Sequence, residues 1–343
     1  MTLETLAAIW FLLWAVLWTV YFMTDGYTLG TGMLTPLVTK NKAERKQMQE
    51  VIGPFWGGNE VWLITAGGAT FAAFSNVYAK MFSSLYEALI LLLACLFFRA
   101  IALELMHKDD NPKWQNFCKW CFGICSLLIA ILLGVAFSNF YLGLDLGPNG
   151  YEGNFFSLLG MYPILGGVLF ALFFLASGAL WVQLKAEGEI CKRSQSYAKV
   201  ATVATLAISA IYLVATFNAA PVMPTNYNNY PILYAVPVLV LVFGILAVLF
   251  TFKKKIGYAF TMVCLQIASF SAFGFIGMFP NMLISRIDPE AYSLTIYNSA
   301  NSETTLMIML IVALIFVPIV IAYKIWAYVL FRRKVTKENA TGY

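Results

Sequence analysis

The sequence predicts an all-α integral membrane protein with about nine membrane-spanning helices. Of its 343 residues, 61% are hydrophobic and only 11% are charged, whereas soluble proteins carry about 25% charged residues. The apolar residues fall in runs of about 20, the length of a helix that crosses a bilayer, and not in the short alternating segments of a β-barrel. The net charge of +5 is spread over short clusters between these runs, which argues against a nucleic-acid-binding function.

The nine apolar segments are expected to form a single polytopic membrane domain over residues 1–343. The first is long enough to be tilted in the bilayer. Because no basic region precedes it, we interpret it as a retained span and not as a cleaved signal peptide. The predicted helices cover residues 7–36, 51–74, 82–105, 117–140, 163–184, 197–217, 232–252, 258–278 and 306–331.

Lysine and arginine residues predict the orientation of these helices. Alternate connections and the carboxyl-terminal tail hold 18 of these residues, and the opposite connections hold only Lys80 and Arg286. Because cytoplasmic loops are enriched in Lys and Arg, the amino terminus is predicted to lie outside and the carboxyl terminus in the cytoplasm. The longest outer connections, 141–162, 218–230 and 280–303, are rich in Asn, Pro, Gly and Tyr and are expected to form interfacial caps.

The second apolar segment contains residues that a simple membrane anchor does not need. Ionisable groups at membrane depth usually face a protein interior or a water path, and paired glycines allow another helix to approach closely. We therefore expect this helix to pack around a polar site. Its distinctive residues are Asn59, Glu60, Trp56, Trp62, Gly57, Gly58, Gly67 and Gly68.

Charged residues cluster in the first three predicted spans. With a rise of about 1.5 Å per residue, Asp25 and Glu60 both lie about 14–17 Å from the cytoplasmic end, so they are expected to share a level and to face each other. Arg99 lies about 9 Å deep on the same scale, where it can balance one of them, and Glu104 lies close to the inner surface. Glu87 is expected near the outer surface.

Two interpretations of these residues remain open. Asp25, Glu60, Asn59, Arg99 and Glu104 are candidates for a proton or cation path that enters from the cytoplasm. The alternative is a buried, paired network that holds the helices in register.

Metal and haem sites are not expected in this chain. The single histidine, His107, lies in a predicted cytoplasmic loop, so a haem with two histidine ligands cannot be built. Cys118, Cys121 and Cys125 share a helix face, but three thiols without a nearby histidine fall short of a tetrahedral set. Methionines in apolar helices are usually packing residues. We predict no catalytic residue and no bound metal, and we assign any redox chemistry to a partner chain.

Motifs in the first third of the chain resemble subunit II of the cytochrome bd quinol oxidases. Residues 24–34, TDGYTLGTGML, resemble the family's TDGFDLGVGML, and residues 54–63, PFWGGNEVWL, resemble its P-x-WDGNEVWL. Residues 65–74 (TAGGATFAAF) continue this match, and the segment 96–104, LFFRAIALE, resembles the arginine-bearing segment that follows in the family. Shorter matches continue to the end of the chain, at 134–139 (GVAFSN), 153–156 (GNFF) and 278–280 (MFP).

The resemblance implies a haem-free partner of a haem-bearing subunit I in the bacterial plasma membrane. The complex would belong to the respiratory electron-transport chain, with haem b and haem d in subunit I, and would oxidise quinol and reduce dioxygen to water. Subunit II would form two four-helix bundles plus a ninth helix, stabilise subunit I and line a proton or oxygen route. A structural quinone and small accessory single-span subunits are compatible with this resemblance.

The sequence departs from the family pattern at two acids that are candidates for the proton path. The second acid of the family's DGFD is Thr28 here, and the acid after the motif tryptophan is Gly57. One hypothesis is therefore a rerouted path through Asp25 and Glu60, and its rival is proton entry through subunit I alone. The alternative function is a secondary transporter that uses Asp25 and Glu60. A secondary transporter is expected to have interrupted helices at matching places in both halves of the chain, whereas the charged cluster predicted here lies in one half. A purely structural membrane scaffold is the third possibility.

Overall fold

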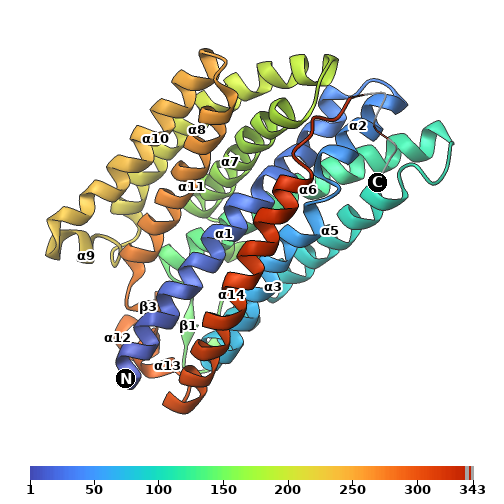
Figure 1. Ribbon diagram of the computed structural model, residues 1–343. Helices are drawn as coiled ribbons and strands as arrows, with labels where there is room; N and C mark the ends of the chain where they lie inside the picture. The colour runs from blue at the N-terminus through green and yellow to red at the C-terminus, as the bar shows by residue number, and fades with distance from the viewer. Residues whose placement is uncertain (337–339, 341–343) are drawn as a thin grey trace.

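The computed structural model describes residues 1–336 and 340 and consists mainly of long helices that run side by side (Figure 1). The long helices are α1 (Leu3–Val38), α3 (Trp56–Ala73), α5 (Tyr86–Leu105), α6 (Pro112–Leu142), α7 (Met161–Lys185), α8 (Glu189–Ala219), α10 (Ala235–Phe252), α11 (Ile256–Met278) and α14 (Glu303–Leu330). The short elements are α2 (Lys42–Ile52), α4 (Ser75–Ser84), α9 (Pro224–Asn229), α12 (Pro289–Tyr292), α13 (Ile296–Ser299), β1 (Leu146–Gly147), β2 (Gly150–Tyr151), β3 (Asn281–Leu283) and β4 (Leu294–Thr295).

Eight helices in the described part of the chain are long and apolar enough to cross a membrane, and they correspond to every predicted span except the second. An α-helix can cross a bilayer because its backbone N–H and C=O groups hydrogen-bond to each other within the segment. The predicted second span, 51–74, is divided between the end of α2 and α3. Asn59, Glu60 and four glycines lower the hydropathy of α3, so a membrane crossing by residues 51–74 stays a prediction.

The long helices form two four-helix groups and one peripheral helix. Helices α1, α3, α5 and α6 form the first group, α7, α8, α10 and α11 form the second, and α14 lies against α1 and α3 (Figure 1). This arrangement confirms the predicted pair of four-helix bundles with one extra helix. Helix α1 contacts α3, α6, α7, α11 and α14, so it is the element around which the two groups meet.

The second half of α1 is buried on every side. All residues from Asp25 to Thr35 are buried, as expected for a helix that is surrounded by other helices. Two glycines permit this packing. A Cβ atom on Gly30 would lie 1.8 Å from the backbone oxygen of Phe174 on α7, and one on Gly178 would lie 2.3 Å from the backbone carbon of Gly30. Small residues at both positions therefore allow α1 and α7 to approach closely.

The glycines of the predicted packing motif on α3 behave differently. A Cβ atom on Gly57, Gly67 or Gly68 would meet nothing within 4 Å in the described part of the chain. The expectation that another helix packs closely against these glycines is therefore wrong for the described helices of this chain. Packing of a partner chain against them stays a prediction. Gly58 is the exception, because a Cβ atom there would lie 2.7 Å from Nζ of Lys324.

Short elements cap the end of the molecule that carries the amino terminus (Figure 1). Strand β1 pairs with β2 and β3 pairs with β4. The two hairpins are joined because Leu144 N donates to Ile284 O at 2.8 Å, and because the Arg286 guanidinium donates to both oxygens of the Asp145 carboxylate at 3.0 and 2.7 Å. The connections expected to be caps thus form an ordered cover.

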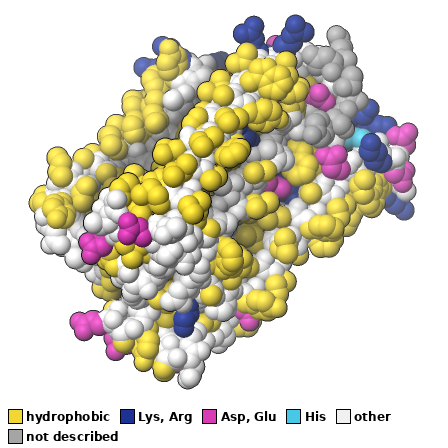
Figure 2. Space-filling model, turned by 60° about the horizontal axis from the view of Figure 1, so that its bottom comes forward, with side chains coloured by type: hydrophobic (Ala, Val, Ile, Leu, Met, Phe, Trp, Pro, Cys, Tyr) yellow, Lys and Arg dark blue, Asp and Glu magenta, His cyan; other side chains and the backbone are white. Residues whose placement is uncertain are grey.

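The opposite end, which we call the basic end, carries most of the loop lysines and arginines. Figure 2 shows most of the Lys and Arg side chains in view along the upper and right-hand rim, with the single His among those on the right, while hydrophobic side chains cover much of the rest. At this end the buried Glu44 of α2 pairs with Arg193 of α8 at 2.8 Å. Gln47 of α2 donates to the backbone oxygens of Glu187 and Val335, so α2 also holds the start of the carboxyl-terminal tail. Lys337, counted in the charge distribution above, lies outside the described residues.

Candidate functional site: a charged cluster among the first helices

Three helices bring charged side chains together inside the first bundle. Asp25 comes from α1, Glu60 from α3 and Arg99 from α5. The Asp25 and Arg99 side chains are fully buried, and the Glu60 side chain is 21% exposed. Together with Thr28 these residues form what we call the arginine cluster.

Arg99 is the hub of the arginine cluster. Its Nη1 donates to Glu60 Oε1, and its Nη2 donates to Thr28 Oγ1 at 2.8 Å and to Asp25 Oδ1 at 3.4 Å. The sequence-based expectation was that Arg99 would balance one acid, whereas it contacts both. Asp25 and Glu60 thus face each other across the guanidinium.

Thr28 lies at the position where the motif DGFD of the resembling family has its second acid. Its hydroxyl donates to Asp25 Oδ1 and also contacts the Asp25 backbone oxygen at 2.9 Å. The same hydroxyl accepts from Arg99. A hydroxyl can accept and donate at once, so Thr28 links cation and carboxylate without adding a second negative charge.

A second set of polar contacts surrounds Asn59, and we call it the asparagine cluster. Asn59 Nδ2 donates to the Thr24 backbone oxygen and to the Tyr27 hydroxyl, each at 2.9 Å. The Tyr27 hydroxyl lies 2.8 Å from the Tyr328 hydroxyl of α14. On the other side, Lys324 Nζ donates to Asn59 Oδ1 at 3.2 Å. The amide of Asn59 therefore joins α1, α3 and α14.

The sequence analysis did not predict that α14 contributes side chains to this site. Lys324 lies inside the predicted ninth span, so a charged residue at membrane depth was a signal that could have identified it. Tyr27 and Tyr328 carried no such signal, because aromatic residues are common in membrane helices. The expectation that the charged residues lie in one half of the chain is wrong, since Lys324 comes from the last helix.

Other predicted site residues lie outside both clusters. Glu104 is half-buried at the basic end of α5, and no hydrogen bond or ion pair joins it to the clusters among the described residues. Trp56 is half-buried, and its Nε1 makes no hydrogen bond with the described atoms. Glu87 is exposed in the first turn of α5, at the end of the bundle that carries the amino terminus.

The single histidine is poorly suited to bind a haem iron. His107 lies on the connection between α5 and α6, outside the predicted spans. Burial first, and then the nearby cations Lys46, Arg45 and Lys42, lower its pKa to about 4. All six cysteines are free, and within residues 1–336 and 340 no group of three or more His, Cys, Asp or Glu side chains is arranged to hold a metal.

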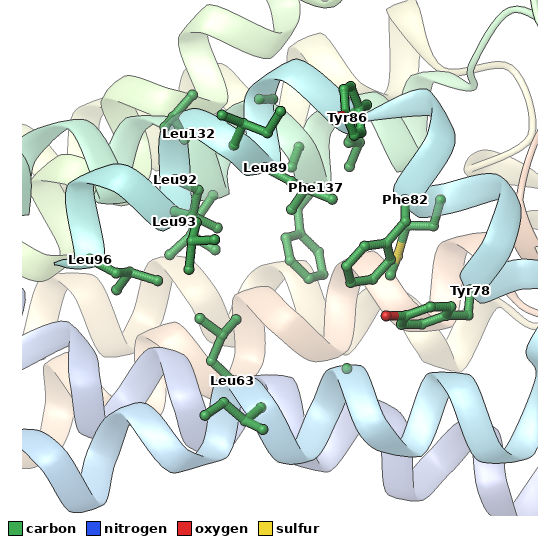
Figure 3. A pocket seen from close by; sticks show the side chains of 18 of the residues that line it. Leu63, Tyr78, Phe82, Tyr86, Leu89, Leu92, Leu93, Leu96, Leu132 and Phe137 are labelled. Carbon is green, nitrogen blue, oxygen red and sulfur yellow. The ribbon is translucent and has the colours of Figure 1, made fainter.

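An apolar cavity of about 820 Å³ lies between α3 and α5. Figure 3 shows Leu63 of α3 facing Leu89, Leu92 and Leu96 of α5 across it. Gly67 and Gly68, where an added Cβ atom would meet no described atom within 4 Å, also line it. The cavity is large enough for part of a long apolar molecule, and its lining offers almost no polar groups.

Comparisons with known proteins agree over nearly the whole chain. The family model "Cytochrome bd terminal oxidase subunit II" matches residues 6–331. The Escherichia coli protein named cytochrome bd-I ubiquinol oxidase subunit 2 is 35% identical, with 98% of this chain and 97% of that protein covered. The Bacillus subtilis cytochrome bd ubiquinol oxidase subunit 2 is 33% identical, with 99% and 100% covered. The structure of the bd oxidase from Geobacillus thermodenitrificans matches with a TM-score of 0.76 at 17% identity, covering 95% of this chain and 98% of that one, and so supports the fold.

Proposed function

We propose, since this chain belongs to the cytochrome bd terminal oxidase subunit II family, that its arginine cluster is a proton relay within the oxidase complex. The chain is a multi-pass subunit of a quinol oxidase of the bacterial inner membrane, an oxidoreductase complex of respiratory electron transport. The alternative of a secondary transporter is not supported, because the family match extends over residues 6–331.

The haems of the complex belong, in this proposal, to a partner subunit I as haem b and haem d. The residues of this chain do not fit a haem with two histidine ligands, since its one histidine, His107, lies on the connection between α5 and α6, outside the long helices. Bound haem would supply the electron transfer and the dioxygen chemistry. The residues of this chain would hold and pass protons and stabilise subunit I, and small accessory single-span subunits would complete the assembly.

The single observation that carries the relay is the arrangement of two carboxylates around one guanidinium at membrane depth. Such groups are costly in a bilayer and usually mark an ion path. In addition, Asp25 Oδ2 and Arg99 Nε are buried and make no hydrogen bond with the described atoms. Buried polar atoms are normally satisfied by protein or ordered water, so we expect water molecules to connect the cluster.

The partly exposed Glu60 suggests where the cluster meets subunit I. Its carboxylate reaches the surface of α3 within an otherwise apolar belt, where Val61 and Ile64 are 53% and 74% exposed. A carboxylate facing lipid is unfavourable, so this surface fits a partner helix that carries a polar group. We place the contact with subunit I here, and we propose that the whole chain acts as one membrane domain with its basic end in the cytoplasm.

The cavity between α3 and α5 fits the tail of a lipid or of a structural quinone. Its lining is almost entirely apolar, so it would hold a hydrocarbon or isoprenoid chain and not a quinol head group in catalysis. Bound quinol, the substrate of the complex, is assigned to subunit I.

Oxidase turnover in amide variants tests the relay. We expect Asp25→Asn together with Glu60→Gln to lower quinol oxidation about a hundredfold, at the lower end of the range of 10² to 10⁴ that general acid–base groups contribute, while the haem spectrum is unchanged. The variant Thr28→Val should lower turnover and Thr28→Ser should preserve it, because only the hydroxyl bridges Asp25 and Arg99. Normal turnover in the double amide variant would show that protons enter through subunit I alone and that the cluster is structural.

A further inference from the structure

Helix α14 touches the rest of the protein mainly through a few specific contacts. Within the described 28-residue helix, Leu306 is the only fully buried residue. Lys324 is half-buried on the side that faces α3, while the neighbouring Ile325 is 59% exposed. A lysine at this depth in a lipid-exposed helix is costly unless it is paired.

The surroundings of Lys324 are shaped for its ammonium group. Nζ donates to Asn59 Oδ1 at 3.2 Å, and Asn59 in turn donates to Tyr27 and to the backbone of α1. Gly58 leaves the necessary space, because a Cβ atom there would lie 2.7 Å from Nζ. Gly58 and Asn59 are the two residues before Glu60 on α3, so the Lys324 ammonium lies beside the arginine cluster.

The charges explain why a cation is needed at this place. The arginine cluster holds two carboxylates, Asp25 and Glu60, and one guanidinium, so it carries one excess negative charge when both acids are ionised. The Lys324 ammonium contacts Asn59, the residue directly before Glu60, at 3.2 Å. With its ammonium included, the positive and negative charges are equal in number, which lowers the cost of keeping them in a medium of low dielectric constant.

We infer that Lys324 is a positioning residue of the proposed proton relay, in which its ammonium balances the second carboxylate and orients Asn59 from α14. The relay therefore depends on the last helix of the chain as well as on the first three predicted spans. The inference rests on the proposed function for its role in proton transfer, but the charge balance can be measured separately.

The test uses the purified oxidase complex with Lys324→Met, Lys324→Arg and the control Ile325→Met, which changes a lipid-facing neighbour. We expect Lys324→Met to give a carboxylic-acid C=O absorption in the infrared at neutral pH, because one acid takes up a proton when its balancing cation is lost. Adding Glu60→Gln or Asp25→Asn should remove that absorption. Turnover should fall about tenfold in Lys324→Met, recover in Lys324→Arg and remain normal in Ile325→Met.

If the oxidase complex with Lys324→Met does not assemble, a second variant provides the same test. Gly58→Ala displaces the ammonium without removing it, and it should produce the same infrared absorption. The inference is overturned if neither variant shows a protonated acid, or if Ile325→Met shows it equally. If the absorption appears while the double amide variant of Asp25 and Glu60 keeps normal turnover, the charge balance stands and only the proton relay fails.

Discussion

The Arg99 guanidinium of α5 lies 3.4 Å from the Asp25 carboxylate of α1, with both side chains fully shielded from solvent. The same guanidinium pairs with Glu60 of α3. One cation thus connects three helices, and α3 and α5 are otherwise separated along part of their length by the apolar cavity. Removing this cation should affect both the bundle and the relay.

Replacement of Arg99 by methionine should strongly destabilise the subunit. Removing one partner of a buried ion pair leaves an unbalanced charge and typically costs about 3–5 kcal/mol. We expect a lower thermal unfolding temperature and a lower yield of assembled complex. The triple variant Arg99→Met, Asp25→Leu, Glu60→Met should recover much of this stability without recovering turnover, because well-packed apolar residues often replace buried ion pairs at little cost. Equal stability of Arg99→Met and the unmodified chain would contradict this view.

Two glycine substitutions should differ in their effect on stability. Gly30→Ala places a methyl group against the backbone of α7, so we expect a loss of about 1–3 kcal/mol in stability, as for other overpacked positions. Gly67→Ala meets open space within the described chain and should leave the isolated subunit unchanged.

The same Gly67→Ala variant tests the predicted helix-packing role of the α3 glycines. If a partner helix packs on Gly67, the variant should weaken assembly with subunit I in a gel-filtration or native-gel comparison. Unchanged assembly would indicate that Gly67 and Gly68 serve only to leave the cavity open.

His107 should make stability depend on pH below neutrality. Burial and the cations Lys46 and Arg45 lower its pKa in the folded chain to about 4, whereas an unfolded chain has a histidine pKa of about 6.5. The unfolded state therefore binds more protons between these values, and stability is full above about pH 6.5 and declines as the pH falls toward 4.

Thermal unfolding between pH 7 and pH 5 measures this effect. His107→Gln should flatten the decline, and Lys46→Met should reduce it, because one repelling charge is removed. An identical pH dependence in His107→Gln and the unmodified chain would assign the decline to other groups.

Much of the fold was predictable because membrane helices have local signals. Runs of about 20 apolar residues identify most helices without knowledge of their neighbours. The second predicted span is the one that the described helices do not confirm, and the reason is local too, since Asn59, Glu60 and the glycines that lower its hydropathy are the residues that make the site. The break at Leu85 that separates α4 from α5 carried no proline or glycine and was missed.

The amino-acid sequence alone determined the membrane class, the number of apolar helices to within one, and the common level of Asp25 and Glu60 with Arg99 within reach of one of them, because hydropathy, charge and helical rise depend only on residues near in sequence. The tertiary structure decided that Arg99 contacts both acids, that Thr28 bridges Asp25 and Arg99, and that Lys324 approaches Asn59. These contacts join residues separated by 74, 71 and 265 positions, and their partners depend on which faces of the helices pack together, which hydropathy does not specify.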